Sequence, residues 1–334
     1  MADKKMTSEL LVRKEAETSS LYGKKPDERT VPELISLGVV VIDKPSGPTS
    51  HQVSDFVQKV LHIEKAGHSG TLDPGVTGVL PVALDKATRI VQVLLGEGKE
   101  YVALMHLHKD VSEEKIREVF KKFIGKITQL PPRKSAVKRQ ERQRTIYFLE
   151  ILEIDGQDVL FKVGCQAGTY IRKLIHDMGI PLGGAHMAEL RRTKASIFVE
   201  SQSVTLQDLA DAYHYWKEEN DDERIRKIIM PVEQALSHLK KVYVFDSSVD
   251  SLCHGSDLKF PGISKLDAGI KKDEIVAIMT LKDELVCLGT AVVESKEMLG
   301  NRGIAVKTQK VFMPPGIYPA MPRKTEGQPV VSVG

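Results

Sequence analysis

One stretch of the chain joins a glycine-rich polar segment to an apolar run: His68-Ser69-Gly70-Thr71-Leu72-Asp73-Pro74-Gly75-Val76-Thr77-Gly78-Val79-Leu80-Pro81-Val82. Its glycines and its Asp-Pro-Gly step predict a tight loop, because glycine permits positive φ and proline pre-sets a turn. The apolar residues 79–84 predict a buried strand. We therefore expect Asp73 to be a single acid on a stiff loop beside the core. Because an Asp-Pro-Gly step more often only begins a turn, its meaning depends on partners elsewhere in the chain.

The composition is that of an ordinary globular protein. The 334 residues suffice for two domains, and 48 Lys and Arg against 45 Asp and Glu give a net charge of +3, so any basic surface must come from local clustering. The three cysteines lie far apart without metal-ligand spacing, which favours a reducing compartment and no metal site. The N-terminus lacks an apolar core and no run has membrane-span length, so we expect a cytoplasmic protein that does not enter membranes.

Hydrophobic periodicity predicts strands and helices up to about residue 240 and short strands after it. Strands are expected at residues 39–42, 101–108, 146–154 and 159–163, and helices after Thr49 or Ser50, Ser112 and Thr205. Short strands and a hairpin over residues 242–316 predict a small β-barrel-like module. The apolar residues 10–12 are expected to add an edge strand to another domain.

Two basic features need an explanation. Residues 131–144 carry six Lys or Arg side chains against one acid, Glu141, in a loop expected to project from the sheet: Arg133, Lys134, Lys138, Arg139, Arg142 and Arg144. A solvated face and a polyanion-binding loop both fit this run. Arg172 lies in the first turn of a predicted helix capped by Thr169, where the helix dipole disfavours a cation. It is explained if it meets a carboxylate or phosphate, and a surface arginine is the alternative.

Five motifs in order resemble one family: Asp43-Lys44-Pro45-Ser46-Gly47-Pro48-Thr49-Ser50-His51, Gly67-His68-Ser69-Gly70-Thr71-Leu72-Asp73-Pro74, Lys99-Glu100-Tyr101, Gly168-Thr169-Tyr170-Ile171-Arg172 and Ala185-His186-Met187-Ala188-Glu189-Leu190-Arg191-Arg192-Thr193. They are similar to the pseudouridine synthases related to the bacterial tRNA T-loop enzyme. Met105-His106-Leu107-His108 and Ser135-Ala136-Val137-Lys138-Arg139 resemble the dyskerin branch, the catalytic subunit of box H/ACA ribonucleoproteins, in an archaeal form. His254-Gly255-Ser256-Asp257-Leu258 resembles part of its PUA RNA-binding domain.

The resemblance implies an α+β fold. A pseudouridine synthase domain over residues 31–238 would hold a central mixed, mostly antiparallel sheet flanked by helices, with a basic thumb loop at residues 133–144. A small β-barrel-like PUA domain would follow at residues 239–318. Residues 1–30 would form an extension that packs on the PUA domain, and residues 319–334 a disordered tail.

The resemblance also implies the chemistry. Isomerising uridine means breaking the N1–C1′ bond, turning the uracil and rejoining it through C5, which needs no redox change and no cofactor. The family likeness makes Asp73 the catalytic carboxylate, which either attacks covalently or takes the C2′ proton. Arg172 would pair with Asp73, and Lys44-Pro45 would brace its loop.

Four further residues would bind substrate by the same resemblance. Tyr101 would stack on the flipped base, Tyr170 would line the pocket and Leu190 would close its apolar wall. His68 would fill the gap left by the extruded nucleotide, because a base inside a stack is out of reach.

The implied partners are a box H/ACA guide RNA, substrate ribosomal RNA and small accessory proteins. The accessory proteins would be a Nop-type protein, a Gar-type protein near the thumb, and a kink-turn-binding ribosomal protein held through the RNA. The thumb cations would grip RNA, and the PUA module with His254 would hold the guide. Two alternatives stay open: a stand-alone tRNA T-loop synthase, and a non-catalytic RNA scaffold, against which the presence of Asp73 and Arg172 argues.

Overall fold

The computed structural model describes residues 9–131 and 140–320, and its contacts divide the chain into two compact units. One unit is Val31–Pro231, and the other combines Met1–Thr30 with Val232–Gly334. Within the described residues, no helix has both the length and the apolar character needed to cross a bilayer. The predicted disordered tail lies almost wholly outside the described residues, as do Arg133, Lys134, Lys138 and Arg139 of the predicted thumb.

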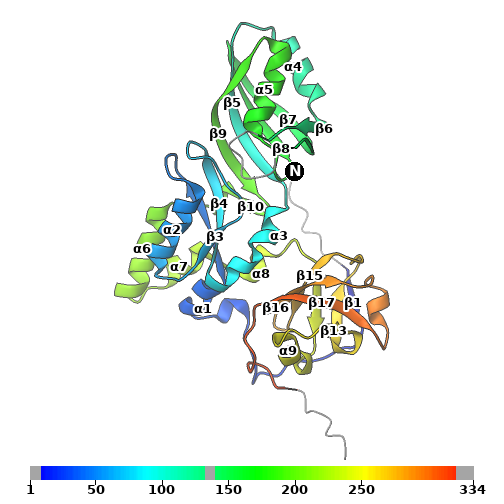
Figure 1. Cartoon of the computed structure of the whole chain (residues 1–334). Coiled ribbons are helices and arrows are strands. Elements are labelled where there is room, and N and C mark those ends of the chain that lie inside the picture. Colours follow the sequence, from blue (N-terminus) through cyan, green and yellow to red (C-terminus); the bar gives the residue numbers. More distant parts are fainter. Residues whose placement is uncertain (1–8, 132–139, 321–334) are drawn as a thin grey trace, which may run out of the picture. The chain divides into compact units, whose positions relative to one another are not determined.

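A large mixed sheet forms the framework of the unit 31–231 (Figure 1). Its main path runs in the order β11 (Ile229–Pro231), β2 (Gly38–Lys44), β4 (Thr77–Leu84), β9 (Ala185–Ala195), β5 (Lys99–Leu107), β8 (Asp158–Cys165), β7 (Arg142–Asp155) and β6 (Gly125–Gln129). Two short strands, β3 (Ala66–His68) and β10 (Phe198–Val199), pair with β4 and β9. The pairing of β4 with β9 is parallel, and the other pairings are antiparallel. The predicted mixed, mostly antiparallel sheet is confirmed.

Helices cover the sheet over two apolar cores. Around β2 and β4 the core includes residues of α1 (Val31–Ser36), α2 (Ser50–Leu61), α6 (Leu206–Glu218) and α7 (Glu223–Ile228). Around β5 and β8 it includes residues of α4 (Glu113–Lys122) and α5 (Ile171–Gly179). The short α3 (Val91–Leu95) precedes β5. Local sequence explains α2, because Thr49 and Gln52 form a capping box and residues spaced by four, Val53, Val57 and Leu61, are buried.

The start of α5 differs from the prediction. Its N-cap is Tyr170, not Thr169, because the Thr169 hydroxyl donates to the carbonyl of Gln166 at 2.7 Å. The side chain of Gln129, in β6, instead accepts from the Tyr170 amide at 3.0 Å and donates to its carbonyl at 3.1 Å. Arg172 is nevertheless the second residue of the helix, in the unfavourable first turn.

The other unit is a β-structure built from both ends of the chain. Its strand order is β1 (Leu10–Val12), β14 (Ile263–Asp267), β12 (Lys241–Val244), β15 (Ile275–Met279), β16 (Leu285–Ala291), β17 (Ile304–Val311) and β13 (Leu258–Lys259). The helices α8 (Val232–Ala235) and α9 (Asp246–Cys253) belong to the same unit. The predicted hairpin is present as β15 and β16, and β1 pairs antiparallel with β14 at the edge.

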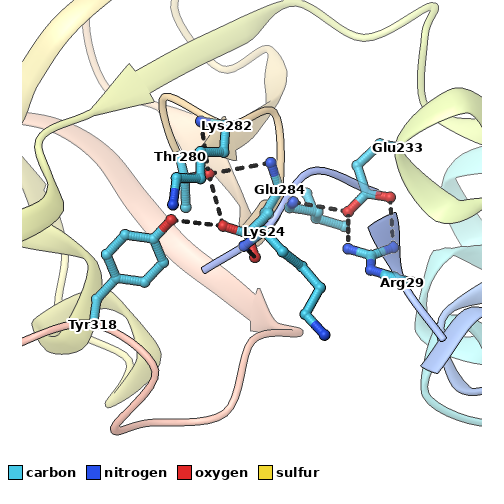
Figure 2. A network of polar contacts seen from close by, with 8 residues as sticks. Lys24, Arg29, Glu233, Thr280, Lys282, Glu284 and Tyr318 are labelled. Carbon is cyan, nitrogen blue, oxygen red and sulfur yellow. Dashed lines mark hydrogen bonds and ion pairs between the residues drawn. The ribbon is translucent and has the colours of Figure 1, made fainter. Parts of the chain in front are cut away.

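Buried polar contacts fasten the N-terminal segment to this β-structure (Figure 2). Arg29 forms a two-pronged ion pair with Glu233 at 2.6 and 2.9 Å, and both residues are buried. The carboxylate of Glu284 accepts from the Tyr318 hydroxyl at 2.6 Å and from the Lys24 amide at 3.2 Å. Residues from the two ends of the chain therefore share one hydrogen-bonded network.

Candidate active site

The buried ammonium of Lys44 holds the loop that carries Asp73 by hydrogen bonds to backbone carbonyls. Lys44 ends β2, is fully buried, and donates to the carbonyls of Pro45 at 2.8 Å, Pro74 at 3.0 Å and Val76 at 2.9 Å. Burial lowers the pKa of Lys44, whereas the charge of Asp73 raises it. Two of the three acceptors, Pro74 and Val76, closely follow Asp73, so Lys44 braces this loop, as the family resemblance implied.

The start of α2 fixes the other side of the loop. The hydroxyl of Ser50 accepts from the Leu72 amide at 2.8 Å and lies 3.2 Å from the Leu72 carbonyl, to which it can donate. The Gly47 amide donates to the Pro74 carbonyl at 2.9 Å. The residues before and after Asp73 are therefore both tied to the segment that follows β2.

Asp73 itself faces solvent and forms an ion pair with Arg172. Arg172 Nη2 lies 3.3 Å from Asp73 Oδ2, and the two side chains are 61% and 64% exposed. The anchored backbone of Asp73 thus presents an accessible carboxylate. The pairing explains a cation in the first turn of α5, which the helix dipole alone disfavours.

A buried arginine connects this loop to the centre of the sheet. Arg192 of β9 is 1% exposed, and it donates through Nε to the Val79 carbonyl at 2.8 Å and through Nη2 to the Gly70 carbonyl at 3.2 Å. Arg192 also lies opposite Tyr101 of β5, and the two side chains interact electrostatically. Gly78 is required where β4 meets β9, because its φ is +103° and a Cβ there would lie 2.2 Å from the Arg192 carbonyl oxygen.

Tyr101 and His68 lie close enough to this charge cluster to be affected by it. Burial raises the pKa of Tyr101, and the charge of Asp73 acts in the same direction, so the phenol stays protonated at neutral pH. Burial lowers the pKa of His68, and the charge of Arg192 adds to this, which favours a neutral imidazole. Among the described residues, the buried Nδ1 of His68 has no hydrogen-bond partner.

The other predicted residues lie in different surroundings. Tyr170 is half-buried, and Leu190 packs beside Tyr101 on the core of β5 and β8. Arg142 and Arg144 lie on β7, where the Arg144 guanidinium reaches Gly168. His254 belongs to the other unit and ends α9, with Nδ1 2.9 Å from the Asp250 carbonyl.

From the sequence no role was assigned to Arg192 or Lys99, and Ser50 was considered only as a helix cap. Lys99 is 7% exposed and donates to the carbonyls of Leu95 at 2.8 Å and Glu97 at 2.6 Å, and burial lowers its pKa to about 8. The pair Arg191-Arg192 was a signal for this role. Neighbouring residues of a strand point to opposite faces, so one of the two arginines had to point inward.

Known families match the chain in consecutive segments. These are the DKCLD (NUC011) domain at residues 2–54, the TruB family pseudouridylate synthase N-terminal domain at 58–114 and 108–171, the tRNA pseudouridylate synthase B C-terminal domain at 172–237, and the PUA domain at 240–312. A "Probable tRNA pseudouridine synthase B" of Pyrococcus abyssi is 58% identical over 309 residues, 92% of each chain. The protein of that name from Methanopyrus kandleri is 54% identical over 323 residues, 96% of each.

Solved structures agree with these matches. One, described as a Cbf5-Nop10-Gar1 complex, contains a chain with a TM-score of 0.90 and 56% identity, covering 95% of this chain and 98% of that one. Another, an H/ACA RNP bound to a substrate RNA containing 2′-deoxyuridine, has a TM-score of 0.88 and 54% identity over 94% and 98%. The fold and the matches define an RNA-modifying enzyme, a pseudouridine synthase, as the sequence predicted. The chain belongs to the TruB family, in its dyskerin-like branch.

Proposed function

We propose that this chain converts uridine to pseudouridine in ribosomal RNA, as the catalytic subunit of a box H/ACA ribonucleoprotein. The observation that carries the proposal is the full-length similarity to chains solved in such particles, one of them with substrate RNA. Nop10-type and Gar1-type proteins are the partners that those structures name, and a kink-turn-binding ribosomal protein would join through the guide RNA. The cytoplasmic location expected from the sequence belongs to the same proposal.

In the proposed mechanism Asp73 is the catalytic carboxylate. The anchored loop would keep its oxygen beside C1′ and C2′ of a flipped uridine, and Arg172 would orient it across the 3.3 Å pair. The protonated phenol of Tyr101 would stack on the freed uracil beside the charge of Arg192. Tyr170 and Leu190 would line the pocket, and neutral His68 would fill the emptied place in the RNA stack.

The RNA contacts are proposed on two surfaces. Arg142 and Arg144 belong to the predicted thumb loop but lie at the start of β7, so the loop ends before them. As cations beside the rest of the thumb, they would contact the RNA that the thumb grips. His254 and the module matched by the PUA family would hold the guide RNA by shape and backbone contacts.

The test is tritium release from RNA labelled at C5 of uridine, because only C5 glycosylation expels that proton. With guide RNA and partner proteins we expect release from the guided uridine, no release with Asp73→Asn, and a normal rate with the exposed control Asp27→Asn. Full activity of Asp73→Asn would refute the assignment of the catalytic carboxylate.

The names of the curated relatives favour a second candidate, a guide-independent tRNA T-loop synthase. Release from bare tRNA without guide would support it, and release only with guide would support the first proposal. The third candidate, a non-catalytic scaffold, requires that no substrate releases tritium. A hairpin ending in ACA among the copurifying RNA would independently favour guided action.

A further inference from the structure

Three histidines and an aspartate form a cluster that the proposed reaction does not use. Across neighbouring strands, His106 of β5 lies directly opposite His186 of β9 on one side and Asp158 of β8 on the other. His108 follows the end of β5, and its amide donates to the Gly184 carbonyl at 3.0 Å. The ring of His186 lies between the other two, with centroids 5.2 Å from His106 and 5.3 Å from His108.

The backbone leaves room for this arrangement. Gly184 has a φ of +113°, and a Cβ at that position would lie 2.5 Å from Nδ1 of His108. A side chain there would displace the His108 ring from His186. The glycine before β9 and the histidine after β5 therefore fit each other.

Hydrogen bonding determines which ring nitrogens are free. Nδ1 of His106 lies 2.7 Å from Asp158 Oδ1, so this nitrogen carries a proton and Nε2 is the nitrogen through which the neutral ring can bind a metal. A carboxylate that orients a histidine in this way is the usual outer partner of a metal-bound imidazole. Nε2 of His108 and Nδ1 of His186 are 3.1 Å apart and share one proton.

We propose that this cluster binds a divalent transition-metal cation such as Zn²⁺ or Ni²⁺, with His108 Nε2 and His186 Nδ1 as its first two ligands. With nitrogen–metal distances of about 2.0–2.1 Å, their 3.1 Å separation gives an angle of about 95–102° at the metal. This lies between the octahedral and tetrahedral angles, and a turn of each ring would aim both lone pairs at one point. The metal takes the place of the shared proton.

The described residues contain no group of three or more His, Cys, Asp or Glu side chains already arranged to hold a metal ion. The third protein ligand therefore requires movement, in which His106 presents Nε2 while Asp158 moves with the ring and keeps its contact with Nδ1. Water completes the coordination, because His108 and His186 are exposed. Occupation of the site would tie the end of β5 to the start of β9.

Calorimetric titration of the RNA-free, chelator-treated full chain with ZnCl₂ or NiCl₂ tests the proposal. We expect one site that weakens at least 10-fold in His108→Ala and in His186→Ala, and about 10-fold in Asp158→Asn, which removes only the outer partner. The exposed control His176→Ala should bind like the unmodified chain. Affinity should fall as the pH is lowered, because protons compete for the same nitrogens.

A second readout locates the ion. Ni²⁺ is paramagnetic, so sub-stoichiometric Ni²⁺ should broaden the Cε1–H signals of His106, His108 and His186 before those of the other histidines. Unchanged affinity in the double variant His108→Ala/His186→Ala, or broadening that begins elsewhere, would overturn the proposal. Circular dichroism of each variant separates a lost site from a lost fold.

Discussion

Replacing Lys44 by methionine would test whether a buried ammonium holds the loop of Asp73. Methionine fits nearly the same space but donates no hydrogen bond, so the carbonyls of Pro45 and Val76 would lose the partners they have at 2.8 and 2.9 Å. The Pro74 carbonyl would keep the amide of Gly47. At about 1–3 kcal/mol for each of the two orphaned acceptors, we expect a loss of about 2–6 kcal/mol in the free energy of unfolding.

Two assays read out Lys44→Met. For a unit of about 200 residues, 1 kcal/mol corresponds to about 2–4 °C in Tm, so the Tm should fall by roughly 4–24 °C. Because a shift of about 1 Å in a catalytic group can cost about 10²-fold in rate, tritium release should fall by a similar factor. The exposed control Lys86→Met should change neither. A Lys44→Met variant that melts within 3 °C of the original and keeps more than half its activity would refute this reasoning.

Three further outcomes are expected. Arg172→Ala should change Tm little, because an ion pair between exposed side chains contributes about 0–1 kcal/mol. The same variant should slow turnover about 10²-fold, because Asp73 is no longer oriented. A large loss of stability would contradict this expectation. Tyr318→Phe should cost about 1–3 kcal/mol in urea denaturation, because Glu284 is buried and loses a donor; an unchanged midpoint would contradict this. The pKa of Lys99 is lowered from 10.5 in the unfolded chain to about 8 in the folded protein. Between these two pH values the unfolded state binds more protons, so the free energy of unfolding should rise with pH across that window. In Lys99→Met this rise should be absent.

The sequence predicted the features that local periodicity and caps determine. The capping boxes at Thr49 and Thr205 and the strand-like run after Asp73 were all readable in short windows. The unfavourable position of Arg172 also indicated a carboxylate partner, although the choice of Asp73 came from the family resemblance.

Contacts made at long range were not readable in this way. Gln129, which takes the place of the predicted Thr169 cap, contacts Tyr170, 41 positions away in the sequence. The contact of Arg192 with Gly70 spans 122 positions. The residue type alone does not predict a buried long-range contact, because a glutamine or an arginine is usually exposed. The sheet order, which brings β9 between β4 and β5, is what brings Arg192 to the Asp73 loop.

Because the β-structured unit is built from both ends of the chain, its paired strands are synthesised far apart in time. Leu10 leaves the ribosome more than 250 residues before its partner Asp267, so at about 5–20 residues per second β1 waits roughly 10–50 s for β14. During that interval the unit 31–231 emerges complete and can fold, while the N-terminal segment has no sheet edge to join. The Tyr318–Glu284 contact forms last. A nascent chain stalled after the unit 31–231 has emerged from the ribosome, but before β14 has, should therefore expose residues 9–30 to protease while the unit 31–231 is already resistant.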